Sequence, residues 1–476
     1  MISNSELKAF TKDGIRIPDL LIWAQCIVFA ALYPVWMIYE LLYFRRILLI
    51  SGALLAIYPI YLYRHYFFQK RALPVWLMLG LFAWVLLHLF FLSHDYPAQL
   101  LELRRIWKYA GLGAVFALGL GLSLSSDNSR HKILHWSAIY FGLCLPLLIY
   151  LLKYVLTMYG ALWGVSAPAF LKINSDGNSA YYIPKTDYIA FCLPVLALSI
   201  GQIYSLLVSN FRLRANQYLA LFCYLFVIMG TLFLFYIQNT KNGIIYAVIC
   251  IALFLGLLLF KASSVKLWQK ALLVMVVVIG SSPLLYTHLQ KNDSWRTLIA
   301  DTKVGFQLEQ YPQWKYAGEQ GYPTNEYGKI VSVTNYERAA WFKAGAQLAA
   351  KDPLGYGLLE DSFKRMVKDN WPEASSHLSH SHSGWLDLIL GLGLPGFACI
   401  LLALFLLISQ SSMAQEPWKS LVFWALIANL ILWVTTEVAA TISFSALIFW
   451  IFWACGLTLI DKQHQRDGGS EIPDEI

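Results

Sequence analysis

The sequence predicts an all-α membrane protein that crosses the bilayer many times. Hydrophobic residues make up 58% of its 476 positions and charged residues only 13%, whereas about a quarter of the residues in a soluble domain are charged. Mean hydropathy is +0.55. The apolar residues gather in runs of about 20, the length of a helix that spans the hydrocarbon core of a bilayer.

Twelve apolar runs predict twelve transmembrane helices, of which the second is short. They lie near residues 20–39, 47–63, 74–92, 106–124, 134–157, 188–208, 217–237, 243–260, 271–287, 386–408, 419–436 and 441–460. An even number of spans puts both termini on one side of the membrane. The spans divide the chain into helices 1–9 (1–287), a large, mainly helical loop (288–385), helices 10–12 (386–460) and a disordered tail (461–476).

Basic residues predict which side the termini occupy, because cytoplasmic loops of membrane proteins are enriched in Lys and Arg. With a cytoplasmic N-terminus, the inside segments hold Lys8, Lys12, Arg16, Arg64, Lys70, Arg71, Arg130, Lys132, Arg212, Arg214, Lys261, Lys266, Lys270, Lys419, Lys462 and Arg466. The short outside loops hold only Arg45, Arg46, Arg104, Arg105, Lys172, Lys185 and Lys241. We therefore expect cytoplasmic termini and an outward-facing loop 288–385, periplasmic in a bacterium. The net charge of +8 is then explained by topology and anionic lipid, and no nucleic-acid partner is expected.

The large loop contains two stretches with helical patterning, 336–350 and 360–369. Asn335 or Thr334 is the expected N-cap of the first. All seven cysteines fall in apolar stretches outside this loop, so neither a disulfide framework nor a cysteine metal site is expected.

Three histidines, His377, His380 and His382, lie within six residues at the end of the loop. Imidazole is the side chain best suited to move protons near neutral pH, which makes His382 a candidate general base. The alternatives are histidines that merely sit at a wet interface, and a zinc site. The zinc interpretation is weak, because the chain has no HExxH motif and Asp387 is the one obvious carboxylate partner. We expect no metal and no cofactor.

Cations on the same outer face are candidate ligands for an anion. Arg338 lies in the first loop helix, Lys241 in the short turn QNTKNG, and Lys185 in YYIPKTDY before a span. A cation next to a helix N-terminus is a natural phosphate site. The alternative for each is a simple interfacial anchor.

Two segments carry a resemblance to a known family. His382-Ser-Gly-Trp-Leu386, followed by Gly393-Leu-Pro-Gly396, resembles the histidine motif of the O-antigen ligase and polymerase superfamily. Arg338-Ala-Ala-Trp341, with Pro353-Leu-Gly355-Tyr-Gly357 and Phe363 after it, resembles the arginine and Pro-x-x-Gly-x-Gly segment of that family. The chain departs from the family pattern with Ser383 in place of Asn, Gly391 in place of an acidic residue and Lys241 in place of Arg.

The resemblance implies a glycosyltransferase that moves a glycan from undecaprenyl pyrophosphate to a sugar hydroxyl of the lipid A core, at the periplasmic face of the bacterial inner membrane. It implies His382 as base, with Arg338, Lys241 and Lys185 binding the pyrophosphate. His380 is expected to bind acceptor or support His382, and Asp387 to orient an imidazole or cap its helix. The expected partners are the lipid-linked glycan, the lipid A core and membrane lipids. Alternatives are an O-antigen polymerase or protein O-oligosaccharyltransferase and, more remotely, a twelve-span transporter, for which paired halves and midplane charges are missing.

Overall fold

A computed structural model of the protein describes residues 17–127, 130–173, 179–209, 215–435 and 441–460. Within these ranges eleven helical segments are long and apolar enough to cross a membrane. They contain α2 (Asp19–Trp36), α3 (Leu42–Leu62), α4 (Leu73–Phe91), α6 (Lys108–Ser126), α7 (Lys132–Tyr159), α8 (Lys185–Ser209), α9 (Ala215–Ile237), α10 (Lys241–Lys261), α11 (Leu267–Lys291), α15 (Gly384–Gln410) and α17 (Thr441–Leu459). The predicted all-α polytopic membrane fold is confirmed.

The remaining expected span, 419–436, corresponds to α16 (Trp418–Leu432), which at 15 residues is shorter than the others. Part of that expected span and the predicted disordered tail, 461–476, lie outside the described residues. The short helical elements are η1 (Tyr39–Leu41), η2 (Arg64–Phe68), η3 (Lys70–Ala72), α5 (Tyr96–Glu102), η4 (Leu103–Trp107), η5 (Ala161–Trp163), η6 (Ala169–Leu171), η7 (Asp293–Trp295), η8 (Pro312–Tyr316) and η9 (Ser411–Met413).

Helices α6 and α17 form the centre of the bundle and touch backbone to backbone. A Cβ atom on Gly121 would lie 2.5 Å from the Trp453 carbonyl oxygen, and one on Gly456 would lie 2.4 Å from that of Leu118. Small residues let membrane helices approach closely enough for van der Waals packing, which drives their association without a hydrophobic effect. Any larger side chain at these two positions would separate the helices.

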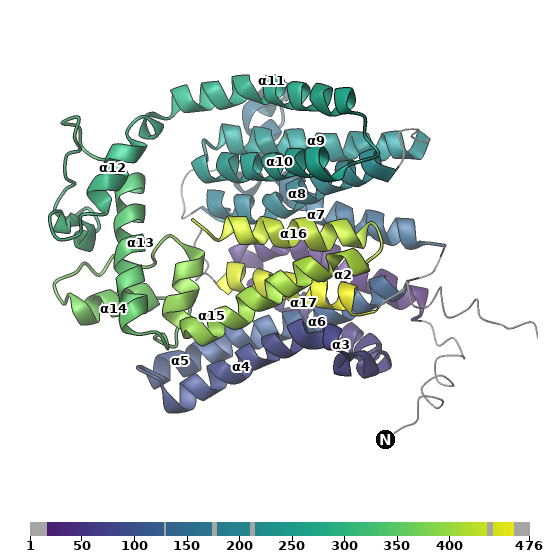
Figure 1. The fold of residues 1–476 in the computed structure, drawn as a ribbon, viewed down its shortest axis with the longest axis horizontal. Helices are drawn as coiled ribbons and strands as arrows, with labels where there is room; N and C mark the ends of the chain where they lie inside the picture. The colour runs from purple at the N-terminus through teal and green to yellow at the C-terminus, as the bar shows by residue number, and fades with distance from the viewer. Residues whose placement is uncertain (1–16, 128–129, 174–178, 210–214, 436–440, 461–476) are drawn as a thin grey trace, which may run out of the picture.

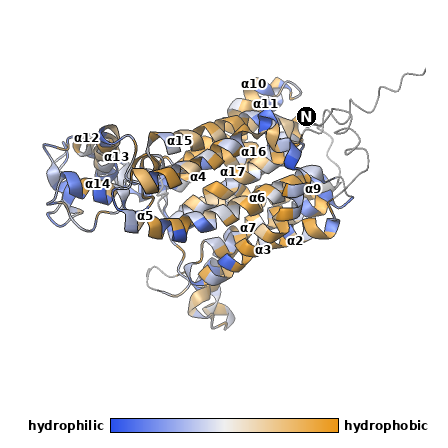
Figure 2. Cartoon of the chain, turned by 90° about the horizontal axis from the view of Figure 1, so that it is seen from below, coloured by the Kyte–Doolittle hydropathy of each residue, from blue (hydrophilic) through white to orange (hydrophobic). Residues whose placement is uncertain are grey.

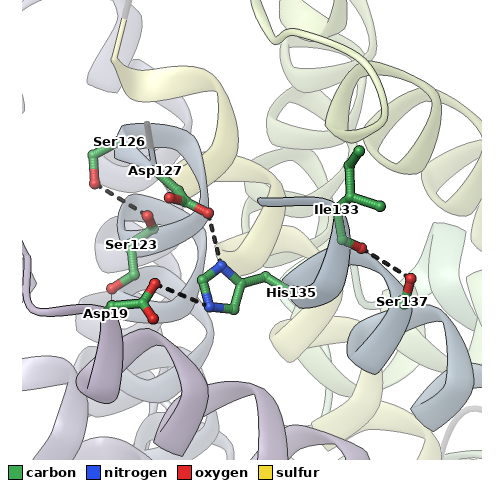
Figure 3. Close-up of polar contacts among 7 residues, drawn as sticks. All are labelled: Asp19, Ser123, Ser126, Asp127, Ile133, His135 and Ser137. Carbon is green, nitrogen blue, oxygen red and sulfur yellow. Dashed lines mark hydrogen bonds and ion pairs between the residues drawn. The ribbon is translucent and has the colours of Figure 1, made fainter. Parts of the chain in front are cut away.

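A buried histidine joins three helices at one end of the bundle (Figure 3). His135 Nδ1 lies 2.8 Å from Asp127 Oδ2 at the end of α6, and His135 Nε2 lies 3.4 Å from Asp19 Oδ1 at the start of α2. Ser125 of α6 also donates a hydrogen bond to the Gly456 carbonyl near the end of α17. The start of α2 and the end of α17 therefore lie at the same end of the bundle.

The loop between α11 and α15 folds into a separate helical layer at the opposite end, and Figure 2 shows that end as the most hydrophilic part of the molecule. It contains α12 (Leu298–Gly305), α13 (Val333–Lys351) and α14 (Ser362–Asn370). Its own core is aromatic and includes Trp314, Tyr336, Trp341 and Phe363. The predicted helices 336–350 and 360–369 are confirmed as α13 and α14. The predicted caps are wrong, because α13 starts earlier and Ser332 is its N-cap.

Candidate active site

The histidine loop is held by the helix that follows it. Ser383 is the N-cap of α15, so Asp387, within the first turn, does not have the capping role. Its buried carboxylate instead accepts a hydrogen bond from the Ser381 backbone N–H at 2.9 Å. The Ser381 hydroxyl bridges the backbone N–H and carbonyl of Ser383. His382, between these anchors, adopts a left-handed φ of +58°. Such a conformation costs about 1–3 kcal/mol and persists only where the surroundings enforce it.

The three histidines separate into a pair and an outlier. The His382 ring stacks on Trp341 of α13, with 5.0 Å between centroids and 12° between planes. The His380 ring meets His382 edge to face, 4.4 Å away. His377 points elsewhere: its side chain is 77% exposed and Nε2 lies 3.8 Å from a Glu319 carboxylate oxygen. Both rings of the pair are half-buried, which leaves His382 oriented by an aromatic face. No group of metal-binding side chains is found among the described residues.

Two cations are held together by a reciprocal pair of asparagines (Lys241 and Asn242 of α10, Asn335 and Arg338 of α13). Lys241 Nζ donates to Asn335 Oδ1 at 3.0 Å, and Arg338 Nη1 donates to Asn242 Oδ1 at 3.0 Å. Asn335 and Arg338 are three residues apart, so they share one face of the helix. The neighbouring pair at the start of α10 bonds to that face. The structure therefore brings Lys241 and Arg338 together through the neutral amides of Asn335 and Asn242.

Asp301 fixes the orientation of Asn335. This fully buried carboxylate of α12 accepts hydrogen bonds from Asn335 Nδ2 at 3.0 Å and from Asn325 Nδ2, the Thr297 hydroxyl and the Ser332 N–H. Asn335 Nδ2 also donates to the Ser294 carbonyl at 2.8 Å. With both amide hydrogens engaged, the amide oxygen faces Lys241. Sequence reasoning missed Asp301 and Asn242, because their roles depend on contacts between distant segments.

The base candidate and the cation pair are both positioned by α13. Trp341, on which His382 stacks, lies three residues after Arg338 and thus on the same side of the helix. Glu337, next to Arg338, accepts a hydrogen bond from the Tyr322 hydroxyl at 2.7 Å, and burial raises the pKa of its carboxyl. Lys185 is different. It is exposed at the start of α8, and no hydrogen bond or ion pair joins it to another candidate within the described part of the chain.

The Pro-Leu-Gly-Tyr-Gly segment packs against a kink in α15. Gly393 breaks the helical backbone with φ +67° and ψ 177°, and the Tyr356 and Gly357 N–H groups donate to the Leu390 and Gly391 carbonyls at 2.8 and 2.9 Å. Gly355, at φ +81°, approaches so closely that a Cβ would lie 2.3 Å from the Gly393 nitrogen. On the other side, buried His88 of α4 lies 3.0 Å from the Gly355 carbonyl. The segment thus links α4 to the helix that carries the histidine loop.

Residues 224–401 match the family described as O-antigen ligase. This segment contains Lys241, Arg338 and His382 but not Lys185. The match confirms the resemblance to the O-antigen ligase superfamily and supports a multi-pass membrane enzyme of the glycosyltransferase type that acts on lipid-linked glycans. No curated protein matches the chain at a significant level.

Proposed function

Because residues 224–401 carry the O-antigen ligase match, we propose that the protein transfers a glycan from undecaprenyl pyrophosphate to a sugar hydroxyl of the lipid A core. The reaction takes place at the periplasmic face of the bacterial inner membrane, with loop 288–385 on that side and both termini in the cytoplasm. The observation that carries this proposal is the shared face of α13, where Arg338 lies one turn from the ring that stacks on His382.

In the proposed reaction the acceptor hydroxyl attacks the anomeric carbon of the donor glycan. His382 takes the hydroxyl proton, a new C–O bond forms, and the bond between the anomeric carbon and the diphosphate breaks. A positioned base is worth about 10²–10⁴-fold in rate. The stack on Trp341 and the Asp387-anchored loop hold the imidazole in place, and His380 supports it from the edge.

The leaving diphosphate gains negative charge as that bond breaks. Arg338 and Lys241 supply positive charge where it develops, and the asparagine oxygens hold both side chains in place. Charge stabilisation of this kind favours the transition state over the ground state. Lys185 is retained as a further pyrophosphate candidate on its sequence position alone.

The test is transfer in vitro from a defined undecaprenyl-pyrophosphate glycan to purified lipid A core. We expect the wild-type protein to be active with or without chelator, and His382→Ala to lose activity by about 10²-fold or more while keeping its expression level and unfolding temperature. His377→Ala, at an exposed histidine of the same loop, is the control and stays active. Near-wild-type turnover by His382→Ala would refute the base assignment.

A deletion strain separates the ligase from its alternatives. Ligase activity predicts lipopolysaccharide without the glycan, with lipid-linked polymer retained. Loss of the long polymer itself would instead indicate a polymerase, loss of glycan from proteins alone would indicate a protein O-oligosaccharyltransferase, and intact glycans with altered solute uptake would indicate a transporter.

A further inference from the structure

His288 is a buried histidine that the proposed reaction does not use. It lies in the last turn of α11 and is 0% exposed. Neither ring nitrogen has a hydrogen-bond partner within the described residues. A buried polar group without a partner costs about 1–3 kcal/mol, so such a group in a native protein needs an explanation, of which a bound ligand is one.

Trp295 shares this property and lies against His288. The two rings meet edge to face, 6.3 Å apart. The indole Nε1 of Trp295 is also buried without a hydrogen-bond partner in the described part of the chain. Lys241 Nζ lies 5.8 Å from the centre of the same indole ring. Lys241 and Lys291 are the charged groups that interact electrostatically with His288. The cluster therefore adjoins the candidate active site at Lys241.

Donors exceed acceptors in this cluster. The Lys241 ammonium has three N–H groups, the Trp295 indole only donates, and a histidine ring carries at least one N–H. Among the described residues, the hydrogen bond that these three side chains make is the one from Lys241 to the Asn335 amide oxygen. A ligand that satisfies these donors brings several acceptor oxygens, and the positive charge of Lys241 favours an anionic one. A phosphate group has both.

The position of α11 indicates which phosphate. This helix lies along the outer edge of the bundle, where it packs against α10 (Figure 1). Most of its apolar side chains are exposed, including Met275, Val276, Ile279 and Tyr286, so they face lipid in a membrane. Lys241 lies near the Trp295 ring just after α11 and also donates to Asn335 of α13. Helix α13 belongs to the aqueous loop, carries Arg338 and contacts His382 through Trp341. A prenyl chain therefore belongs on the α11 side and its sugar on the α13 side.

We propose that His288 and Trp295, with Lys241, bind the lipid-proximal phosphate of the polyprenyl diphosphate, while Arg338 binds the sugar-proximal one. The inference rests on the proposed function and assigns a direction to the donor in the site. The last turn of α11 must shift to uncover the His288 ring, and the light packing of α11 permits this. The site recognises a phosphate on a lipid, whose sources are a polyprenyl carrier and an anionic phospholipid.

The experiment measures binding separately from transfer. Full-length protein in lipid nanodiscs is titrated with labelled polyprenyl monophosphate, which carries only the lipid-proximal phosphate. The variants are His288→Leu and Trp295→Phe, which remove donors and keep an apolar side chain. His288→Gln retains a donor, and Trp268→Phe, on the exposed part of the same helix, is the matched control. The KM for the glycan donor, kcat and the unfolding temperature are measured for each protein.

His288→Leu and Trp295→Phe are expected to weaken polyprenyl monophosphate binding about tenfold each, equivalent to about 1.4 kcal/mol. The KM for the donor rises in parallel, kcat stays within about twofold, and His288→Gln restores part of the binding. Because the buried donors lack partners, their removal leaves the unfolding temperature unchanged or raises it. A merely structural role would lower that temperature.

Unchanged binding in both donor-removing variants, or an equal loss in Trp268→Phe, would overturn the proposal. The proposal would also fail if the variants differed from wild type in binding only when the nanodiscs contain phosphatidylglycerol. The site would then bind this bulk phospholipid and not the polyprenyl carrier. If the wild-type protein binds polyprenyl monophosphate through His288 but transfers no glycan, the proposed function fails and the phosphate site stands. If transfer is normal and the variants bind like wild type, only this inference fails.

Discussion

Asn242 illustrates how the site depends on single polar atoms. Its amide oxygen accepts from Arg338 at 3.0 Å, and its amide nitrogen donates to the Thr435 carbonyl at 3.3 Å. One side chain at the start of α10 therefore links α13 to the segment that follows α16. The acceptor that positions the Arg338 guanidinium is a neutral amide oxygen.

The Arg338 guanidinium is the cation that we expect to stabilise the leaving diphosphate. Arg338→Ala is expected to lower kcat by about 10²–10³-fold, the typical effect of removing one donor that stabilises developing charge. Arg338→Lys should retain part of the activity, because lysine keeps the charge but loses the planar fork that grips phosphate oxygens. Steady-state transfer measures both. Lys351→Ala, at the far end of α13, is the control. Equal activity of Arg338→Ala and wild type would remove this residue from the mechanism.

At the scale of elements, the kink in α15 decides where the histidine loop lies. The kink at Gly393 is possible because Gly355 packs against it without a side chain, and two backbone hydrogen bonds from Tyr356 and Gly357 fix the contact. The Pro-Leu-Gly-Tyr-Gly motif thus packs between α4 and α15. We expect it to influence the position of His382 because the histidine loop leads directly into α15.

Gly355→Ala tests this coupling. Both Gly355 and Gly328 have positive φ angles, +81° and +67°, but a Cβ at Gly328 meets nothing within 4 Å. Gly328→Ala should therefore cost only backbone strain, about 1–2 kcal/mol. Gly355→Ala adds a clash with the Gly393 backbone, so we expect a clearly larger fall in unfolding temperature, together with weaker transfer. Thermal unfolding in detergent and the transfer assay measure the two effects. Indistinguishable behaviour of the two variants would argue against a tight contact.

At the scale of the whole molecule, two polar clusters lie at opposite ends of the bundle. The candidate active site lies beside the loop helices, whereas the Asp19–His135–Asp127 cluster joins α2, α6 and α7 at the far end. In this second cluster His135 and Asp127 are buried, whereas the Asp19 side chain is 41% exposed. We interpret it as a polar clamp between helix ends.

His135→Ala should separate stability from chemistry. The variant loses the hydrogen bond between the imidazole and the Asp127 carboxylate, at a cost of about 1–3 kcal/mol in the free energy of unfolding. Its kcat at temperatures below unfolding stays close to wild type, opposite to His382→Ala. Unfolding temperature and transfer rate are measured on the same preparations. A large kcat loss in folded His135→Ala protein would mean that the far end is coupled to the site.

The sequence could predict the helices because a run of about 20 apolar residues is by itself enough to indicate a membrane span. Eleven of the twelve predicted runs coincide with helical segments that are long and apolar enough to span a membrane. The twelfth corresponds to the shorter helix α16, and its predicted end lies outside the described residues. The histidine and arginine candidates also came from local motifs. The N-cap of α13 was missed, because Asn335 engages Lys241 and Asp301, which are distant in the chain.

Composition and periodicity by themselves determined an all-helical protein in a membrane, since burying about 20 apolar residues in lipid is a property of one segment. Only the tertiary structure decided which polar residues meet. Asn242, Asp301, His288 and Trp295 carry no local signal, and their roles arise because α10, the end of α11, α12 and α13 converge at one end of the bundle. Hydrogen bonds act over about 3 Å, so such partnerships exist only once distant segments have packed.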